Sequence, residues 1–339
     1  MKRYIIFIFP MLIVFFSDCR NNNPAEPKNK SGYKIIYDVA PDKIFIMNED
    51  GSDKKLLLIR GRYPKFSPDR QQIGFYSNDR RIRDRVPLLS LCVSKIDSSD
   101  FIFLGETIPR EGGNVIGGFD WSYDSEKIVY SSSSDGSGKQ IYIINADGTG
   151  CTKLTNSGTN FAPMFFPDAQ KIFYITSAGT MVMNIDGSDK HKLMNLYTGR
   201  PSFSPDGTKM VFSISEQADF VDIYIANTNE TNLMQLTNDG MSISLGWSPN
   251  SNKIIFDSGR DGGDLYSMNP DGSEQKRLTN SGNIVPLIWI SPDGEKFAYA
   301  LPTTFEHTQF SINIMTTDGR NDRSLGIGIS TNLDWYQNE

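Results

Sequence analysis

Histidine and cysteine are scarce in this chain. Its 339 residues include two histidines, His191 and His307, and three cysteines, Cys19, Cys92 and Cys151. Protein metal centres draw their ligands largely from these two residue types. Two histidines cannot supply a histidine-rich centre within one chain, so we expect no metal site and no cofactor.

The sequence motifs of common catalytic sites are also missing. No Gly-x-Ser-x-Gly stretch is present to hold a serine nucleophile on a strand-to-helix turn. Gly136-Ser137-Gly138-Lys139 lacks the first glycine of a P-loop, and Gly112–Gly118 does not open a helix. We therefore assign no catalytic residue and expect a protein that is not an enzyme.

Positive charge is not in excess, and long hydrophobic runs are rare. The formal net charge is −6, which gives no electrostatic support for nucleic-acid binding. One long apolar run, Tyr4–Phe16, follows Lys2 and Arg3. A membrane-spanning helix needs about 20 apolar residues, so this run is too short. Residues 1–18 are instead predicted to be a removable signal peptide.

Cys19 directly follows this segment and is the predicted site of lipid attachment. The arrangement resembles a bacterial lipoprotein signal, in which the cysteine becomes the acylated first residue of the mature chain. The polar run 19–32, rich in Asn and Pro, is expected to be a flexible tether. We expect an exported protein, lipid-anchored at the outer membrane; cleavage to a soluble exported protein is the alternative. Cys92 and Cys151 are expected to be free, buried thiols.

A short motif recurs along the rest of the chain, and its clearest copy is Pro201–Ser213. An apolar strand leads into a Ser-Pro-Asp-Gly turn, and a second strand follows. Pro205 presets φ, Asp206 can bond its own backbone, and Gly207 suits a positive φ, so the motif predicts a β-hairpin. The copies carry an aromatic residue that we expect in the hydrophobic core: Phe66, Trp121, Phe165, Phe203, Trp247, Trp289 and Trp335.

A second motif alternates with the first and ends in a tight Asp-Gly turn. Examples are Ile141–Gly148 and Leu265–Gly272. Together the two motifs define a unit of four antiparallel strands joined by hairpins. Consecutive core aromatics from Phe66 to Trp289 lie 38 to 55 residues apart, close to the ~40–45 residues of a β-propeller blade. One unit cannot bury both of its faces, whereas units arranged radially bury them against each other.

The two ends of the repeat region indicate how the ring closes. The chain enters at Tyr33–Tyr37 without a preceding aromatic anchor and finishes with an anchor at Asn332–Tyr336. We expect this C-terminal strand to complete the N-terminal unit. The predicted fold is an all-β, seven-bladed β-propeller over residues 33–339, with four-stranded antiparallel blades and a ring closed by the C-terminal strand. A six-bladed ring is the alternative if one degenerate unit does not form.

The repeated Ser-Pro-Asp-Gly and Asn-x-Asp-Gly turns resemble those of TolB-like, WD40-like β-propeller proteins of the bacterial envelope. The resemblance covers about residues 33–339. It implies the propeller fold and a place at the cell envelope. It does not by itself imply a function, because one fold serves many functions.

The connections of variable length are the predicted location of function. Connections between the second and third strands, and between blades, vary in length and emerge on one face of a propeller. Arginines there can bind carboxylates or phosphates; the alternative is a solvated loop with local Arg–Asp pairs. The candidate binding residues are Arg80, Arg81, Arg83, Arg85, Arg260, Glu306 and His307.

The predicted function is non-catalytic binding or scaffolding at the cell envelope. The expected partner is an envelope protein or a glycan, and the expected oligomeric state is a monomer. The alternative is a carbohydrate-active enzyme, because some related propellers resemble oligogalacturonate lyases. Those enzymes rely on a metal held by several histidines and a glutamine, a cluster that this chain cannot supply.

Overall fold

The computed structural model describes most of the chain beyond residue 31. The described residues are 32–39, 42–77, 88–96, 101–109, 118–133, 135–194, 198–217, 220–248, 250–280, 288–291, 293–302, 310–329 and 333–337. The predicted signal peptide and the predicted lipid attachment site Cys19 lie outside these residues. Within the described ranges, no helix has the length and apolar character needed to cross a membrane.

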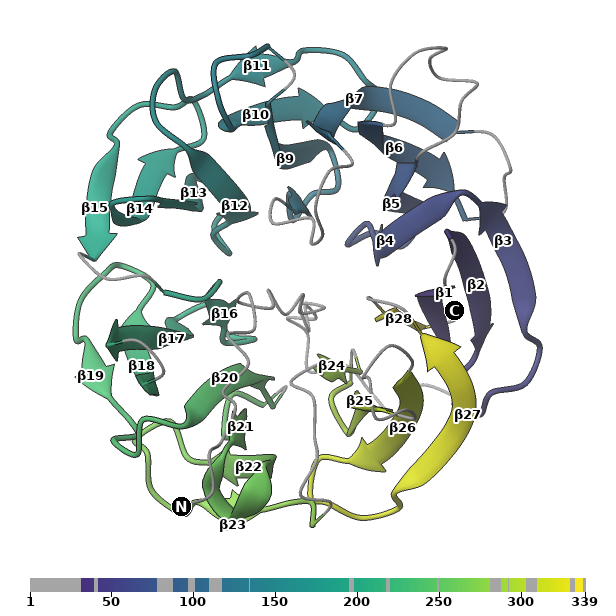
Figure 1. Cartoon of the computed structure of the whole chain (residues 1–339), viewed down its shortest axis with the longest axis vertical. Coiled ribbons are helices and arrows are strands. Elements are labelled where there is room, and N and C mark those ends of the chain that lie inside the picture. The colour runs from purple at the N-terminus through teal and green to yellow at the C-terminus, as the bar shows by residue number, and fades with distance from the viewer. Residues whose placement is uncertain are drawn as a thin grey trace, which may run out of the picture.

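Seven four-stranded antiparallel sheets stand as blades around a ring (Figure 1). Blades 1 to 3 are β28 (Leu333–Gln337), β1 (Tyr33–Val39), β2 (Lys43–Asn48), β3 (Lys55–Ile59); β4 (Gly61–Phe66), β5 (Gln72–Ser77), β6 (Leu88–Lys95), β7 (Phe101–Pro109); and β8 (Phe119–Trp121), β9 (Lys127–Ser132), β10 (Gln140–Asn145), β11 (Thr152–Lys153).

The remaining four blades repeat this order from the centre of the ring outward. They are β12 (Asn160–Phe165), β13 (Lys171–Thr176), β14 (Gly179–Asn184), β15 (His191–Met194); β16 (Ser202–Phe203), β17 (Lys209–Gln217), β18 (Phe220–Asn227), β19 (Met234–Gln235); β20 (Ser242–Trp247), β21 (Ile254–Ser258), the 3₁₀-helix η1 (Arg260–Gly262), β22 (Asp264–Met268), β23 (Lys276–Arg277); and β24 (Ile288–Ile290), β25 (Lys296–Pro302), β26 (Phe310–Thr316), β27 (Arg323–Ile329). The prediction of seven four-stranded blades is confirmed.

The C-terminal strand closes the ring, as predicted from the two ends of the repeat region. β28 pairs antiparallel with β1, and Trp335 lies opposite Ile35. Blade 1 is also bonded to blade 2, because Asp334 Oδ2 accepts a hydrogen bond of 2.8 Å from the backbone N–H of Phe66. A carboxylate on the innermost strand of one blade therefore satisfies a backbone donor on the innermost strand of the next.

The repeated Ser-Pro-Asp-Gly turn uses its own polar side chains. Ser204 donates to Asp206 Oδ1 (2.6 Å) and accepts from the backbone N–H of Lys209 (2.9 Å). Asp206 Oδ1 also accepts from the backbone N–H of Thr208 at 3.0 Å, and Gly207 has a φ of 70°, a conformation that glycine adopts without steric cost. The sequence regularity of these positions is therefore explained by the turn itself.

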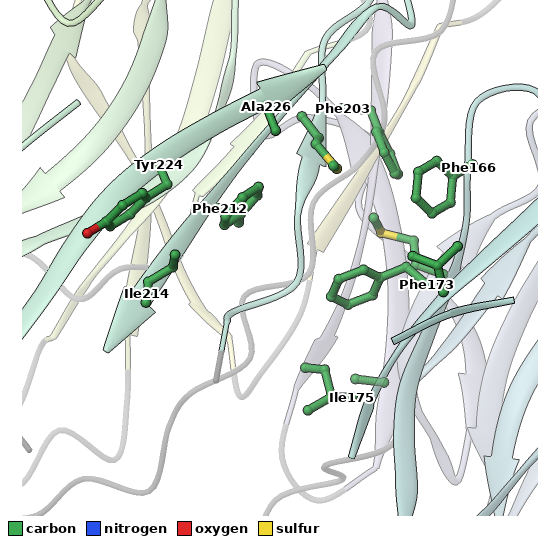
Figure 2. Packing of buried hydrophobic residues seen from close by; sticks show 12 residues of the cluster. Phe166, Phe173, Ile175, Phe203, Phe212, Ile214, Tyr224 and Ala226 are labelled. Atoms are coloured by element: carbon green, nitrogen blue, oxygen red, sulfur yellow. The ribbon is translucent and has the colours of Figure 1, made fainter. Parts of the chain in front are cut away.

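The hydrophobic core is divided among the interfaces between blades. Between blades 4 and 5, for example, the rings of Phe166 and Phe203 lie 5.0 Å apart and pack with Phe173 and Phe212 (Figure 2). Burying each such side chain stabilises the fold by roughly 1.5–3 kcal/mol. The seven repeat aromatics predicted for the core are all buried, with exposed fractions of 6% or less.

The two cysteines of the described residues are free, but only one is buried. Cys92 lies in the core between blades 1 and 2, as expected. The expectation of a buried thiol is wrong for Cys151, which is exposed. Cys151 directly precedes β11, a two-residue strand that is the outermost of its blade.

Candidate binding surface

The variable connections form one face of the ring, which we call the connection face. The antiparallel order of each blade places the second-to-third connections and the links between blades on this face. Their lengths differ between blades. Residues 177–178 connect β13 to β14 in blade 4, whereas residues 259–263, which include η1, connect β21 to β22 in blade 6. The turns on the opposite face, such as 204–208 and 291–295, share one pattern of internal hydrogen bonds.

Most of the predicted binding residues lie outside the described part of the chain. These are Arg80, Arg81, Arg83, Arg85, Glu306 and His307. Arg260 is described, and it opens η1 on the connection face of blade 6. The structure therefore bears directly on one of the seven candidates.

Arg260 is engaged by neighbouring side chains of its own blade. Its Nε donates to Ser258 Oγ at 2.9 Å, and its Nη1 donates to Gln275 Oε1 at 2.8 Å. The guanidinium carbon lies 4.5 Å from the ring centre of Tyr266 and 5.6 Å from that of Phe256. This stacking is a cation–π contact that also uses the flat shape of the group. These contacts hold the Arg260 side chain against blade 6.

Asp239 organises the link between blades 5 and 6. Its carboxylate accepts from the backbone N–H of Met241 (3.0 Å) and from Ser242 Oγ (2.9 Å). It also forms an ion pair with Arg260, with 3.2 Å between Oδ2 and Nε. The single carboxylate therefore joins the inter-blade link to η1 and fixes the position of Met241. Sequence reasoning did not single out Asp239.

Two exposed apolar side chains lie beside this network. Phe220, at the start of β18, is 55% exposed, and Met241, in the inter-blade link, is 56% exposed. A parallel bridge joins Val221 to Met241. Large apolar side chains are usually buried, so their proximity marks a surface feature. We call the surface of Phe220, Gly240, Met241 and Gly259 the blade 5–6 patch.

The central hairpin of blade 5 is longer than that of blade 4. β17 continues to Gln217 and β18 begins at Phe220. β17 and β18 have nine and eight residues, whereas β13 and β14 of blade 4 have six each. The extended hairpin carries the strand pattern of blade 5 onto the connection face and positions Phe220 there.

An acidic pair lies on the neighbouring strands β21 and β22. Asp264 is fully buried and forms an ion pair with Arg277 and a hydrogen bond with Thr279 (2.7 Å). By contrast, Asp257 Oδ1 is buried without a hydrogen-bond partner among the described residues. Burial, reinforced by the negative charge of Asp264, raises the pKa of Asp257 to about 7. Asp257 therefore changes its charge near neutral pH.

Within the described ranges, no group of three or more His, Cys, Asp or Glu side chains is arranged to hold a metal ion. Asp239 and Asp264 are occupied by arginine and hydroxyl partners. Between blades 5 and 6, the connection face presents exposed apolar side chains beside the ion pair of Asp239 and Arg260.

Comparison with known proteins supports the same architecture. Residues 176–334 match the family model described as the TolB beta propeller domain. The Tol-Pal system protein TolB of Francisella tularensis subsp. mediasiatica (strain FSC147) is 27% identical over 239 residues, which are 66% of this chain and 54% of that protein. The chain is a TolB-like β-propeller protein.

Solved structures share the fold at low sequence identity. TolB from Acinetobacter baumannii superposes with a TM-score of 0.55 at 16% identity, covering 91% of this TolB-like chain and 68% of that protein. An oligogalacturonate lyase in complex with manganese superposes with a TM-score of 0.60 at 15% identity, covering 79% and 82%. At these identities the likeness concerns the fold alone. The chain spans only 16 to 54% of the length of its first three curated relatives.

Proposed function

We propose that this TolB-like propeller is an exported, non-catalytic binding module that recognises a partner at the bacterial cell envelope through its connection face. The similarity to a Tol-Pal system protein supports a place at the envelope. The N-terminal segment supports export, and Cys19 supports a lipid anchor that would hold the ring at the outer membrane.

The observation that carries the proposal is the contrast between the two faces. On the opposite face, the polar residues of the repeated turns are used by the turns themselves, as at Ser204 and Asp206. On the connection face, Phe220 and Met241 are more than half exposed although the rigid frame around them is well packed. Variable connections held by a rigid scaffold are the usual place of recognition.

Site-specific photo-crosslinking in the native bacterium tests this assignment. Asn238 and Asn252 are both exposed and flank blade 6 on opposite faces, the first in an inter-blade link and the second in a first-to-second turn. A photoreactive amino acid at position 238 should form a discrete adduct with an envelope component, and the same group at position 252 should not. Failure to form an adduct at position 238, or equal adducts at both positions, would contradict the proposal.

The lyase alternative is tested separately. Purified protein should not cleave a polyuronide, with or without added manganese. Turnover that a chelator abolishes would replace the binding proposal with a catalytic one. The superposition on the lyase identifies no catalytic residue in this chain, because proteins that share a fold need not share an active site.

A further inference from the structure

The outer edges of blades 1 and 2 expose apolar side chains on two strands. Leu56 in β3 is 46% exposed, and Ile102 and Phe103 in β7 are 44% and 43% exposed. β3 and β7 are the outermost strands of neighbouring blades and lie on the circumference of the ring (Figure 1). We call these three side chains the blade 1–2 rim.

The exposed side chains of the rim are held by packed neighbours. Leu57, which follows Leu56, and Phe101, at the start of β7, both pack against the core cluster between blades 1 and 2. The Phe101 ring meets that of Phe75 in β5 edge to face, with 5.7 Å between their centres. The apolar surface of the rim is therefore continuous with the core and fixed in position.

The predicted tether enters the ring beside this rim. It ends where β1 begins, at Tyr33. Lys34 in β1 forms an ion pair with Asp53 (3.3 Å between Nζ and Oδ2). Asp53 also pairs with Lys55 at 3.2 Å, and Lys55 directly precedes Leu56 in β3. Two ion pairs thus connect the strand on which the tether ends to the strand that carries part of the rim.

The length of the tether limits the distance between this rim and a lipid anchor. The tether comprises the 14 residues 19–32. A chain of this length spans roughly 20 Å as a flexible coil and about 50 Å when fully extended. An anchor at Cys19 would therefore keep blade 1 close to the bilayer. Tethering also raises the effective concentration of the two surfaces, so that a weak contact suffices.

The rim is bordered by charges of both signs. The described charged side chains around it include lysines and carboxylates: Lys34, Lys54, Lys55, Lys95, Glu49, Asp50, Asp53 and Asp147. With both signs present, a contact here depends on the apolar side chains rather than on net charge. Lysine suits a lipid interface, because its stem packs on apolar surface while its amine stays solvated. Lys54 already packs in this way, with Nζ 4.7 Å from the ring centre of Phe45.

We propose that the blade 1–2 rim contacts the surface of the phospholipid bilayer that holds the Cys19 anchor, with Leu56, Ile102 and Phe103 entering the layer between headgroups and acyl chains. This inference rests on the lipid anchor of the proposed function and adds the orientation of the ring. Blades 1 and 2 would face the membrane, and blade 5, across the ring, would face away from it (Figure 1). The connection face would then remain accessible to a partner.

Photo-crosslinking of the full-length protein in the native bacterium tests this contact. A photoreactive phenylalanine derivative in place of Phe103 should form an adduct with the mass of one phospholipid, measured by mass spectrometry of the intact protein. The matched position is Met234, which is 45% exposed on the outermost strand β19 of blade 5. Its phospholipid adduct should be at least about fivefold weaker, because the tether ends in blade 1.

Variants test the contribution of the apolar side chains. Leu56→Ser with Ile102→Ser should lower the phospholipid adduct from position 103 about fivefold or more, since interfacial binding scales with the apolar area buried. Leu56→Met with Ile102→Leu preserves that area and should retain the adduct, as should the control Leu233→Ser in blade 5. The unfolding temperature of each variant is measured alongside. Leu56→Ser alone should lower the adduct in the same direction and replaces the double variant if that variant is destabilised.

The outcomes separate this inference from the anchor on which it rests. Absence of a palmitate-analogue label at Cys19 contradicts the anchor and the inference together. A labelled protein that forms no phospholipid adduct from position 103, or equal adducts from positions 103 and 234, overturns the inference alone. So does an adduct that survives the serine variants. An adduct of protein mass from position 103 also overturns it, because a protein would then cover the rim.

Discussion

The indole N–H of Trp335 in β28 donates a hydrogen bond of 2.9 Å to the backbone carbonyl of Trp289 in β24. This bond joins blade 1 to blade 7, where the two ends of the propeller meet. Trp247 donates in the same way to the carbonyl of Ser202 at 2.9 Å, which joins blades 6 and 5. The repeated tryptophan therefore serves two purposes: its ring fills the core, and its N–H satisfies a carbonyl of the preceding blade.

Trp335→Phe should destabilise the ring by about 1–2 kcal/mol, because it removes a buried hydrogen bond between the indole N–H and the carbonyl of Trp289. Denaturant unfolding measures the change. Trp247→Phe removes the equivalent bond within the ring and should cost a similar amount. An unchanged unfolding midpoint for Trp335→Phe would show that the bond adds nothing to closure.

Asp257→Asn should stabilise the protein above about pH 7. The pKa of this carboxyl is raised to about 7 in the folded state, and it is about 3.9 in an unfolded chain. The folded state therefore binds the extra proton, so stability rises as pH falls from about 7 to 4. Over this pH range, the free energy of unfolding of the wild type should change relative to that of the variant by at most about 4 kcal/mol, since one pKa unit corresponds to about 1.4 kcal/mol. Parallel unfolding profiles at pH 5 and pH 8 would contradict this prediction.

The contact of His191 with Glu230 should strengthen as pH falls. His191 Nδ1 faces the carbonyl of Asp189 (2.9 Å), and its Nε2 faces Glu230 Oε2 (2.8 Å). Both nitrogens meet acceptors, so the Glu230 carboxylate, helped by that carbonyl, raises the pKa of His191. The stabilisation is complete below the pKa of about 6.5 of the unfolded chain and is lost as pH rises through the higher folded pKa.

A double-mutant cycle with His191→Gln and Glu230→Gln isolates this contact from the second partner of Glu230, Lys171 at 2.7 Å. The coupling between positions 191 and 230 should be below about 1 kcal/mol, as for other partly exposed pairs. It should be larger at pH 6 than at pH 8.5. Equal coupling at both values would mean that the imidazole does not change its charge between pH 6 and pH 8.5.

Cys151 should react with a thiol reagent in the native protein, and Cys92 should not. The first thiol is exposed and the second has an exposed fraction of 0%. In a Cys19→Ala background, mass spectrometry should find one label per chain before unfolding and two after it. Rapid labelling of Cys92 would mean that blades 1 and 2 separate readily.

Cys19→Ala should abolish incorporation of a palmitate analogue and release the protein from the membrane fraction. The reason is chemical, because the thiol is the acceptor of the first lipid in the signal that this N-terminus resembles. Cys151→Ala is the matched control and should keep the label. Label that persists in Cys19→Ala would remove the lipid anchor from the proposal.

The architecture was predictable because it depends on local chemistry that recurs. Ser204 and Asp206 are needed by a turn, and Phe203 by a core, so the pattern survives in nearly every unit. The blade 5–6 patch was not predictable, since the exposure of Phe220 and Met241 depends on how two blades meet. Cys151 was assigned to the core because free cysteine is among the most often buried residue types, and it is exposed.

Closure of the ring also bears on how the protein is completed. Tyr33 in β1 pairs with Gln337 in β28, so the first blade cannot be finished before the last strand is available. A chain that emerges with its N-terminus first leaves the inner edge of β1 unpaired until then. In an exported protein, the final sealing of the ring would therefore take place on the far side of the membrane, after the whole chain has crossed.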